Sequence, residues 1–216
     1  SWSDRPVKRA ASHRFDFAVS RGARAFVLAS HGATIGLALA LPIETGRLRL
    51  RRLAATDLER FVAYRSDAVV GRYQGWSPMS RDAARGFLQQ MADAEGLVGG
   101  QWLQLAIADA NTDALLGDLG LHPDERFESL EIGFTLAADQ QGRGYATEAV
   151  GAVARALFRE TPIRSIRAVT DARNLPSVAL LERLGFERAA THDAVFRGEP
   201  CVEYVYVLER SGESTG

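Results

Sequence analysis

One octapeptide carries more information than any other part of this chain: Gln141-Gly142-Arg143-Gly144-Tyr145-Ala146-Thr147-Glu148, between a predicted strand and a predicted helix. Its two glycines let the main chain turn tightly and approach a ligand without an intervening Cβ. The free N–H groups of such a turn, and of the first turn of the helix, form a cradle for an anion at the positive end of the helix dipole. The octapeptide therefore predicts a pyrophosphate site, with an ordinary glycine-rich helix start as the simpler alternative.

Two better-known phosphate motifs are excluded at this position. A Walker A loop needs Lys followed by Ser or Thr after its last glycine, and Tyr145 stands there instead. The dinucleotide fingerprint G-x-G-x-x-G/A would place its third glycine at Thr147. A diphosphate bound here is therefore held by a different type of loop.

Hydrophobic periodicity places the octapeptide inside a series of strands and helices. The predicted strands are 47–53, 102–108, 115–121, 129–136, 163–170, 188–196 and 201–209, and the predicted helices are 57–65, 80–95, 146–159 and 177–184. This order is typical of an α/β domain with a mixed sheet and helices on its faces.

A second motif follows the strand predicted at 163–170. Residues 174–186 have the pattern N-x-x-S-x-x-L-L-E-R-L-G-F, and residues 141–146 have the pattern Q-x-x-G-x-A. Together, in this order, the two motifs resemble the GNAT acetyltransferase superfamily, and the resemblance covers about residues 43–210. The strand at 131–134 and the closing hairpin resemble its ribosomal-protein N-terminal acetyltransferase (RimJ/RimL-like) branch.

The resemblance implies a GNAT fold, with a mixed, mostly antiparallel central sheet of about seven strands, about four flanking helices, and a splay between the fourth and fifth strands. It also implies acetyl-CoA as co-substrate, with the pantetheine arm along the splayed strand end and the diphosphate in the cradle. The residues implied for coenzyme A are Phe134, Thr135, Leu136, Gln141, Gly142, Arg143, Gly144, Tyr145, Ala146, Thr147, Asn174 and Ser177. Asn174 as a turn former and Ser177 as a helix-start residue are the structural alternatives.

Catalysis of amine acetylation needs a group that collects a proton, because an amine attacks a thioester only in its neutral form. The resemblance implies Glu131, whose side chain alternates away from the apolar face of its strand; an exposed strand glutamate is the alternative. Many superfamily members carry a tyrosine as the acid where this chain has Leu181, so Ser177 is the expected substitute. The alternative is a thiol that leaves without an acid, with main-chain N–H groups polarising the carbonyl.

Fewer features of the sequence indicate where the acceptor amine binds. Tyr73 and Trp76 are assigned to the acceptor pocket, with a loop pinned by its own aromatic residues as the alternative. His122 is interpreted as a turn residue that could face the acceptor site. Cys201, the only cysteine, is interpreted as a small buried residue and not as a nucleophile.

The implied reaction is transfer of an acetyl group from acetyl-CoA to a primary amine by direct attack in a ternary complex. A protein or peptide N-terminal α-amine is the expected acceptor; a small-molecule amine (amino acid, polyamine or antibiotic) or a non-catalytic acyl-CoA-binding sensor are the alternatives. A net charge of −1, with basic residues concentrated near the N-terminus, argues against a nucleic-acid partner. We expect no membrane partner, no metal, because the four histidines are scattered, and a monomer or homodimer.

The expected domain limits are 1–40 for an N-terminal extension, disordered or outside the fold, 41–210 for the acetyltransferase domain, and 211–216 for a tail. The extension loosely imitates a signal sequence, but His31-Gly32 interrupts its apolar stretch. A single cysteine favours a reducing compartment, so we expect the protein in the cytoplasm.

Overall fold

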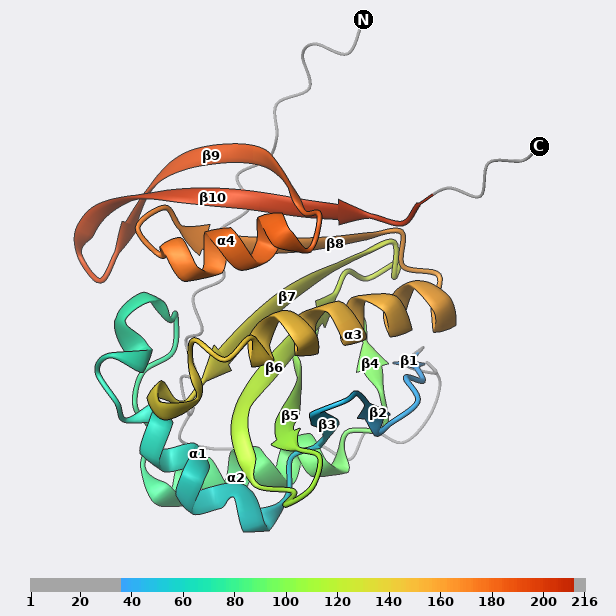
Figure 1. Ribbon diagram of the computed structural model, residues 1–216, viewed down its shortest axis with the longest axis vertical. Helices are drawn as coiled ribbons and strands as arrows, with labels where there is room; N and C mark the ends of the chain where they lie inside the picture. Colours follow the sequence, from blue (N-terminus) through green and yellow to red (C-terminus); the bar gives the residue numbers. More distant parts are fainter. Residues whose placement is uncertain (1–35, 212–216) are drawn as a thin grey trace, which may run out of the picture.

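The computed structural model describes residues 36–211 (Figure 1). Its strands are β1 (Gly36–Leu37), β2 (Ile43–Glu44), β3 (Leu48–Arg52), β4 (Leu97–Val98), β5 (Leu103–Asp109), β6 (Leu115–Pro123), β7 (Ser129–Leu136), β8 (Ser165–Asp171), β9 (Glu187–Phe196) and β10 (Glu199–Glu209). Its helices are α1 (Leu58–Arg65), α2 (Arg81–Asp93), α3 (Tyr145–Glu160) and α4 (Leu175–Arg183), with 3₁₀ turns η1 (Ala55–Asp57), η2 (Val70–Tyr73) and η3 (Ala138–Gln140).

Eight strands form one sheet in the order β2-β3-β5-β6-β7-β8-β10-β9. Only β7 and β8 run parallel; the other neighbouring strands are antiparallel. This sheet with its four α-helices confirms the predicted fold, and the fourth and fifth predicted strands are β7 and β8. The prediction lacked β1, β2 and β4, because two-residue strands are too short to show a hydrophobic period.

The helices cover both faces of the sheet (Figure 1). Successive residues of β5 show the division: Leu105 and Ile107 pack in the cluster that contains α3 and α4, whereas Ala106 packs in the cluster that contains α1 and α2. Such alternation is the geometry of a strand buried on both sides.

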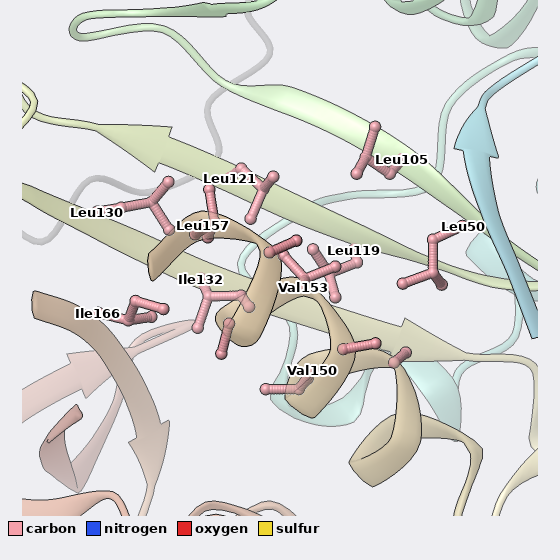
Figure 2. Packing of buried hydrophobic residues seen from close by; sticks show 14 of the residues in the cluster. Leu50, Leu105, Leu119, Leu121, Leu130, Ile132, Val150, Val153, Leu157 and Ile166 are labelled. Atoms are coloured by element: carbon pink, nitrogen blue, oxygen red, sulfur yellow. The ribbon is translucent and has the colours of Figure 1, made fainter. Parts of the chain in front are cut away.

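The larger core lies between the sheet and α3. Figure 2 shows Val150, Val153 and Leu157 of α3 directed at leucine and isoleucine side chains of the strands. These three positions share one face because they are spaced three and four residues apart. Each of the three is completely buried, which fixes α3, and with it the loop before α3, against β7.

Residues before position 41, the expected start of the domain, already belong to the fold. Gly36 and Leu37 pair with Val98 and Leu97, and Leu39 is a member of the larger core. The expectation for the N-terminal extension otherwise falls on residues 1–35, which lie outside the described residues. In the described part of the chain, no helix combines the length and the apolar character that crossing a bilayer requires.

Candidate active site

The central feature of the site is a gap in the sheet between β7 and β8. The two strands pair only over three residues each, 129–131 with 165–167. Beyond these residues β7 stays on β6 as far as Leu136, while β8 stays on β10 as far as Asp171. The sheet therefore splays at the C-terminal ends of both strands, and a cleft of about 460 Å³ opens there.

A row of free main-chain amides follows directly after β7. Gly142 and Gly144 adopt positive φ angles of 73° and 78°, which strongly favour glycine. Among the described residues, none accepts a hydrogen bond from the six successive amides of residues 142–147. These amides stand at the N-terminus of the 16-residue helix α3. Together with the helix dipole they make a site for an anion.

The edge of β7 that faces the gap is available to an extended ligand. Phe134, Thr135 and Leu136 pair with β6 but not with β8. Gln141 ties the amide loop to this edge, because its Nε2 donates to the carbonyl oxygen of Leu136 at 3.1 Å. The Nε2 of Gln74 lies 3.5 Å from the carbonyl oxygen of Phe134. A chain that contains amides can therefore pair with β7 as an added strand that ends at the anion site.

Asn174 and Ser177 line the cleft from the start of α4, beside Leu181. The helix begins at Leu175, two residues earlier than predicted, because Asn174 is its N-cap. The Oδ1 of Asn174 accepts a hydrogen bond from the amide of Ser177 at 3.5 Å. Asn174 thus has a structural role at the cleft wall, whereas the Ser177 hydroxyl has no partner among the described residues.

Glu131 lies where β7 leaves β8. Its Oε2 accepts from Nη1 of Arg167 at 2.7 Å, and both side chains line the cleft. Its Oε1 has no hydrogen-bond donor among the described residues. The neighbouring residues Leu130 and Ile132 are buried against α3, so Glu131 faces the other side of the sheet, as its strand alternation predicts.

The cleft lining also includes Trp102 and Arg167, which the sequence analysis did not assign to it, and His122, for which the acceptor site was only the alternative. The prediction of a turn at His122 was wrong, because β6 runs on to Pro123 at the end of the sheet. His122 is the cross-strand partner of Glu131, and its ring contacts that of Trp102 in a tilted arrangement, with 4.9 Å between centroids and 37° between planes. Continuing the alternation of Leu119 and Leu121 would have placed His122 on the face of Glu131.

The loop over the cleft contributes Tyr73 but not Trp76. Tyr73 and Gln74 line the cleft, whereas Trp76 is 3 % exposed and belongs to the core between α1, α2 and the sheet. The guanidinium of Arg65 lies 4.7 Å from the Trp76 ring centroid, and Arg65 also forms a buried ion pair with Asp118 at 2.6 Å. Trp76 therefore anchors the loop by packing in this core, and we do not retain it as an acceptor-binding residue.

The carboxylate of Asp171, the last residue of β8, is paired with an arginine. The bidentate ion pair with Arg173 lowers the pKa of Asp171 below its ordinary value. Cys201 does not line the cleft, and burial raises the pKa of its thiol. A thiol held protonated in this way is a poor nucleophile.

The segment that contains both motifs and strands β3 to β8 matches a known family model. Residues 47–187 match the model described as acetyltransferase (GNAT) domain. The chain belongs to the GNAT acetyltransferase family. This acetyltransferase is 30 % identical over 146 residues to the uncharacterized N-acetyltransferase p20 of Bacillus licheniformis, with 67 % of this chain and 81 % of p20 covered.

Two solved structures show the same fold. An acetyltransferase (GNAT family) from Bacillus anthracis superposes with a TM-score of 0.70 at 23 % identity, over 79 % of this chain and 99 % of that chain. RimL, a ribosomal L7/L12 alpha-N-protein acetyltransferase solved with coenzyme A, gives a TM-score of 0.66 at 17 % identity, over 78 % of this chain and 97 % of that chain. The family assignment makes the protein an acetyl-CoA-dependent N-acetyltransferase.

Proposed function

We propose that this acetyltransferase acts on the α-amine of a protein or peptide N-terminus, by direct attack of the amine on acetyl-CoA in a ternary complex. The observation that carries the proposal is the six successive free amides of residues 142–147 beside the unpaired edge of β7. The amide row and the edge of β7 are thereby suited to a diphosphate and a pantetheine arm, and the cleft that begins at Phe134 has room for the acceptor. RimL, a solved structural neighbour, is an alpha-N-protein acetyltransferase, in accord with the branch resemblance at the β7 strand.

In the proposed donor complex, Gln141–Thr147 hold the diphosphate through main-chain amides, and the side chain of Arg143 adds a charge-assisted contact. Phe134, Thr135 and Leu136 bind the pantetheine arm through their main chain. Asn174 and Ser177 lie at the opposite wall and hold the end of the arm. The exposed main chain of Gly142 and Gly144 fits this use, because both residues adopt positive φ angles that favour glycine and leave no Cβ beside the amides.

Glu131 is the proposed acceptor of the amine's proton. Its free Oε1 can bind the amine or a bridging water, while Arg167 fixes the orientation of the carboxylate through Oε2. An α-amine, with an ordinary pKa of about 8, is partly neutral at pH 7, whereas a lysine amine at about 10.4 is mostly charged. Modest assistance by one carboxylate therefore suits an α-amine better than a lysine side chain.

The cleft also favours a cationic acceptor. Four carboxylates line it, from Asp124, Glu131, Asp171 and Glu203, against one cleft-lining arginine, Arg167. An ammonium group is attracted to such a surface before it loses its proton. We do not expect the cleft to bind a polyanion, and we retain cytoplasmic location and a monomer or homodimer as predictions.

We assign to Ser177 the hydrogen bond that assists departure of the coenzyme A thiolate. Leu181, which stands where many superfamily members have a tyrosine, lines the cleft without an ionisable group. Ser177 precedes it by one helical turn on α4, and its hydroxyl is free to donate a hydrogen bond to the sulfur. A hydrogen bond to the leaving sulfur lowers the barrier only as negative charge develops there.

Product analysis tests the proposal. The protein is incubated with acetyl-CoA and a mixture of peptides with free N-termini, the same peptides with blocked N-termini but free lysines, and small amines. We expect acetylation of the free N-termini alone, seen by fragment-ion mass spectrometry. Acetylation confined to small amines would move the substrate class to the small-molecule alternative, and coenzyme A binding with no thiol release from acetyl-CoA would indicate a sensor.

A further inference from the structure

A side-chain cluster from the hairpin between β2 and β3 reaches the amide loop from about 100 residues away in sequence. Arg47 donates from Nε to Oε2 of Glu148 at 2.7 Å, and its Nη2 lies 2.6 Å from the same oxygen. Its Nη1 donates to the main-chain carbonyl of Arg143 at 3.0 Å. Its guanidinium also lies 4.7 Å from the ring centroid of Tyr145. One side chain thus touches the loop and the first turn of α3 at three residues.

Thr45 completes the cluster on the side of Glu148. Its Oγ1 donates to Oε1 of Glu148 at 2.6 Å, and the amide of Arg47 donates to the same oxygen at 3.1 Å. Burial by itself raises the pKa of Glu148, but the hydrogen bonds from Thr45 and Arg47 outweigh burial and lower it below its ordinary value. Glu148 is therefore an anion held in the first turn of α3.

The contact with the Arg143 carbonyl sets the direction of the next amide. The peptide unit is planar and trans, so its C=O and the following N–H point in opposite directions. Because the Arg143 carbonyl is directed at Arg47, the N–H of Gly144 is directed away from Arg47. Gly144 has no Cβ and a positive φ, so without this contact the peptide would have several orientations of similar energy.

The contact with Glu148 removes a repulsion. An unpaired carboxylate in the turn that supplies amides to an anion would oppose that anion. The ion pair with Arg47 neutralises the carboxylate, and half of the Arg47 side chain remains exposed. A loop held in its binding conformation and freed of opposing charge loses less free energy on binding.

We propose that Arg47 is a positioning residue for coenzyme A: it orients the Arg143–Gly144 peptide and neutralises Glu148, so that the amides of the loop can bind the diphosphate. The role of Arg47 rests on the diphosphate site proposed above. Arg47 itself need not touch the ligand. Its effect is confined to the diphosphate part of coenzyme A, whereas general damage to the cleft would also affect the pantetheine part.

Calorimetric titration with coenzyme A and with pantetheine, which lacks the diphosphate, tests this role. We expect Arg47→Ala to weaken coenzyme A binding about tenfold and pantetheine binding less than about twofold. Adding Glu148→Gln to Arg47→Ala should recover part of the loss, because the repulsive charge is then absent. The matched control is Arg49→Ala, two residues along β3, where an exposed ion pair with Glu44 is removed and both affinities should stay unchanged.

The outcomes separate the two proposals. Wild-type protein that binds pantetheine as tightly as coenzyme A would refute the diphosphate site, and the role of Arg47 with it. Wild-type protein that prefers coenzyme A, with Arg47→Ala showing the same preference, would refute the role of Arg47 alone; so would an equal loss for both ligands. Thermal melting checks that Arg47→Ala folds, and Arg47→Gln carries the same comparison if it does not.

Discussion

The donor end and the acceptor end of the proposed site are built in different ways. The end assigned to coenzyme A consists of consecutive main-chain groups, the unpaired edge of β7 and the amides of residues 142–147. The end assigned to the acceptor consists of side chains from separate segments, among them Tyr73, Trp102, His122, Glu131 and Arg167. The first end needs a local backbone shape, and the second needs several strands in the correct register.

This difference has a chemical consequence. Main-chain amides do not titrate, so the groups that bind the diphosphate directly keep their charge over the pH range in which the fold is stable. Side chains such as Glu131 and His122 change their charge or their contacts through single substitutions. The donor end can therefore stay the same while the acceptor end changes specificity, and substitutions at the two ends should affect different measured quantities.

The largest effect should come from Gly144→Trp, which breaks the donor end alone. Glycine has φ +78° there, and a tryptophan would add backbone strain, crowd Arg47 and fill the amide cradle. We expect coenzyme A affinity to fall by about a thousandfold or more, equivalent to about 4 kcal/mol, measured by calorimetry on protein whose fold is checked by circular dichroism. Gly198→Trp, at a hairpin turn with φ +87°, is the strain-matched control and should bind coenzyme A normally.

A smaller effect should come from Glu131→Gln, which breaks the acceptor end alone. The amide keeps the size of the carboxylate but cannot collect a proton. We expect kcat to fall by about a hundredfold with the KM for acetyl-CoA unchanged. Glu128→Gln, an exposed glutamate just before β7, is the control. A mutant at position 131 with wild-type kcat would leave the proposed base without support.

The donor end could be predicted from sequence because its shape depends on neighbouring residues. Gly142 and Gly144 indicate positive φ angles, and the helix that follows predicts free amides in its first turn. The splay between β7 and β8 was implied by the family resemblance and not by a local pattern. The order of strands and helices was predicted because long periodic segments show their own hydrophobic pattern.

The acceptor end could not be predicted in the same way. Arg167 meets Glu131 only because β7 and β8 are in one particular parallel register, which no local pattern encodes. Trp76 was assigned to the pocket from its loop, but the buried Arg65–Asp118 pair draws it into the core instead. Arg47 and Glu148 are likewise about 100 residues apart in sequence, so their contact is visible only in the folded chain.

Ser177→Ala tests the cleft wall at the start of α4, which lies between the donor end and the acceptor end. Loss of the hydroxyl removes the proposed hydrogen bond to the leaving sulfur but leaves the amide cradle and Asn174 in place. We expect kcat to fall about tenfold, about 1.4 kcal/mol, with the dissociation constant of acetyl-CoA changed less than about twofold. Ser165→Ala, at the start of β8 and outside the cleft, is the control. Equal losses in kcat and in acetyl-CoA affinity would instead make Ser177 a binding residue.

The smallest effect should come from Asp171→Asn, and it concerns the free energy of unfolding. Its pH dependence distinguishes a titratable side chain at the cleft from main-chain groups, which do not titrate. The ion pair with Arg173 lowers the folded-state pKa of Asp171, so its contribution to stability is complete above the ordinary aspartate value and is lost as pH falls through the lowered pKa. Because Arg173 is 52 % exposed, we expect Asp171→Asn to cost at most about 1 kcal/mol at pH 7. Urea unfolding should show that the difference from wild type shrinks below about pH 4, where the carboxylate of the unfolded chain takes up a proton and that of the folded protein does not yet. Asp193→Asn, on the exposed strand β9, is the control and should show no such convergence. A difference that stays constant down to pH 2 would mean that Asp171 stabilises the end of β8 through its shape and its hydrogen bonds, and not through its charge.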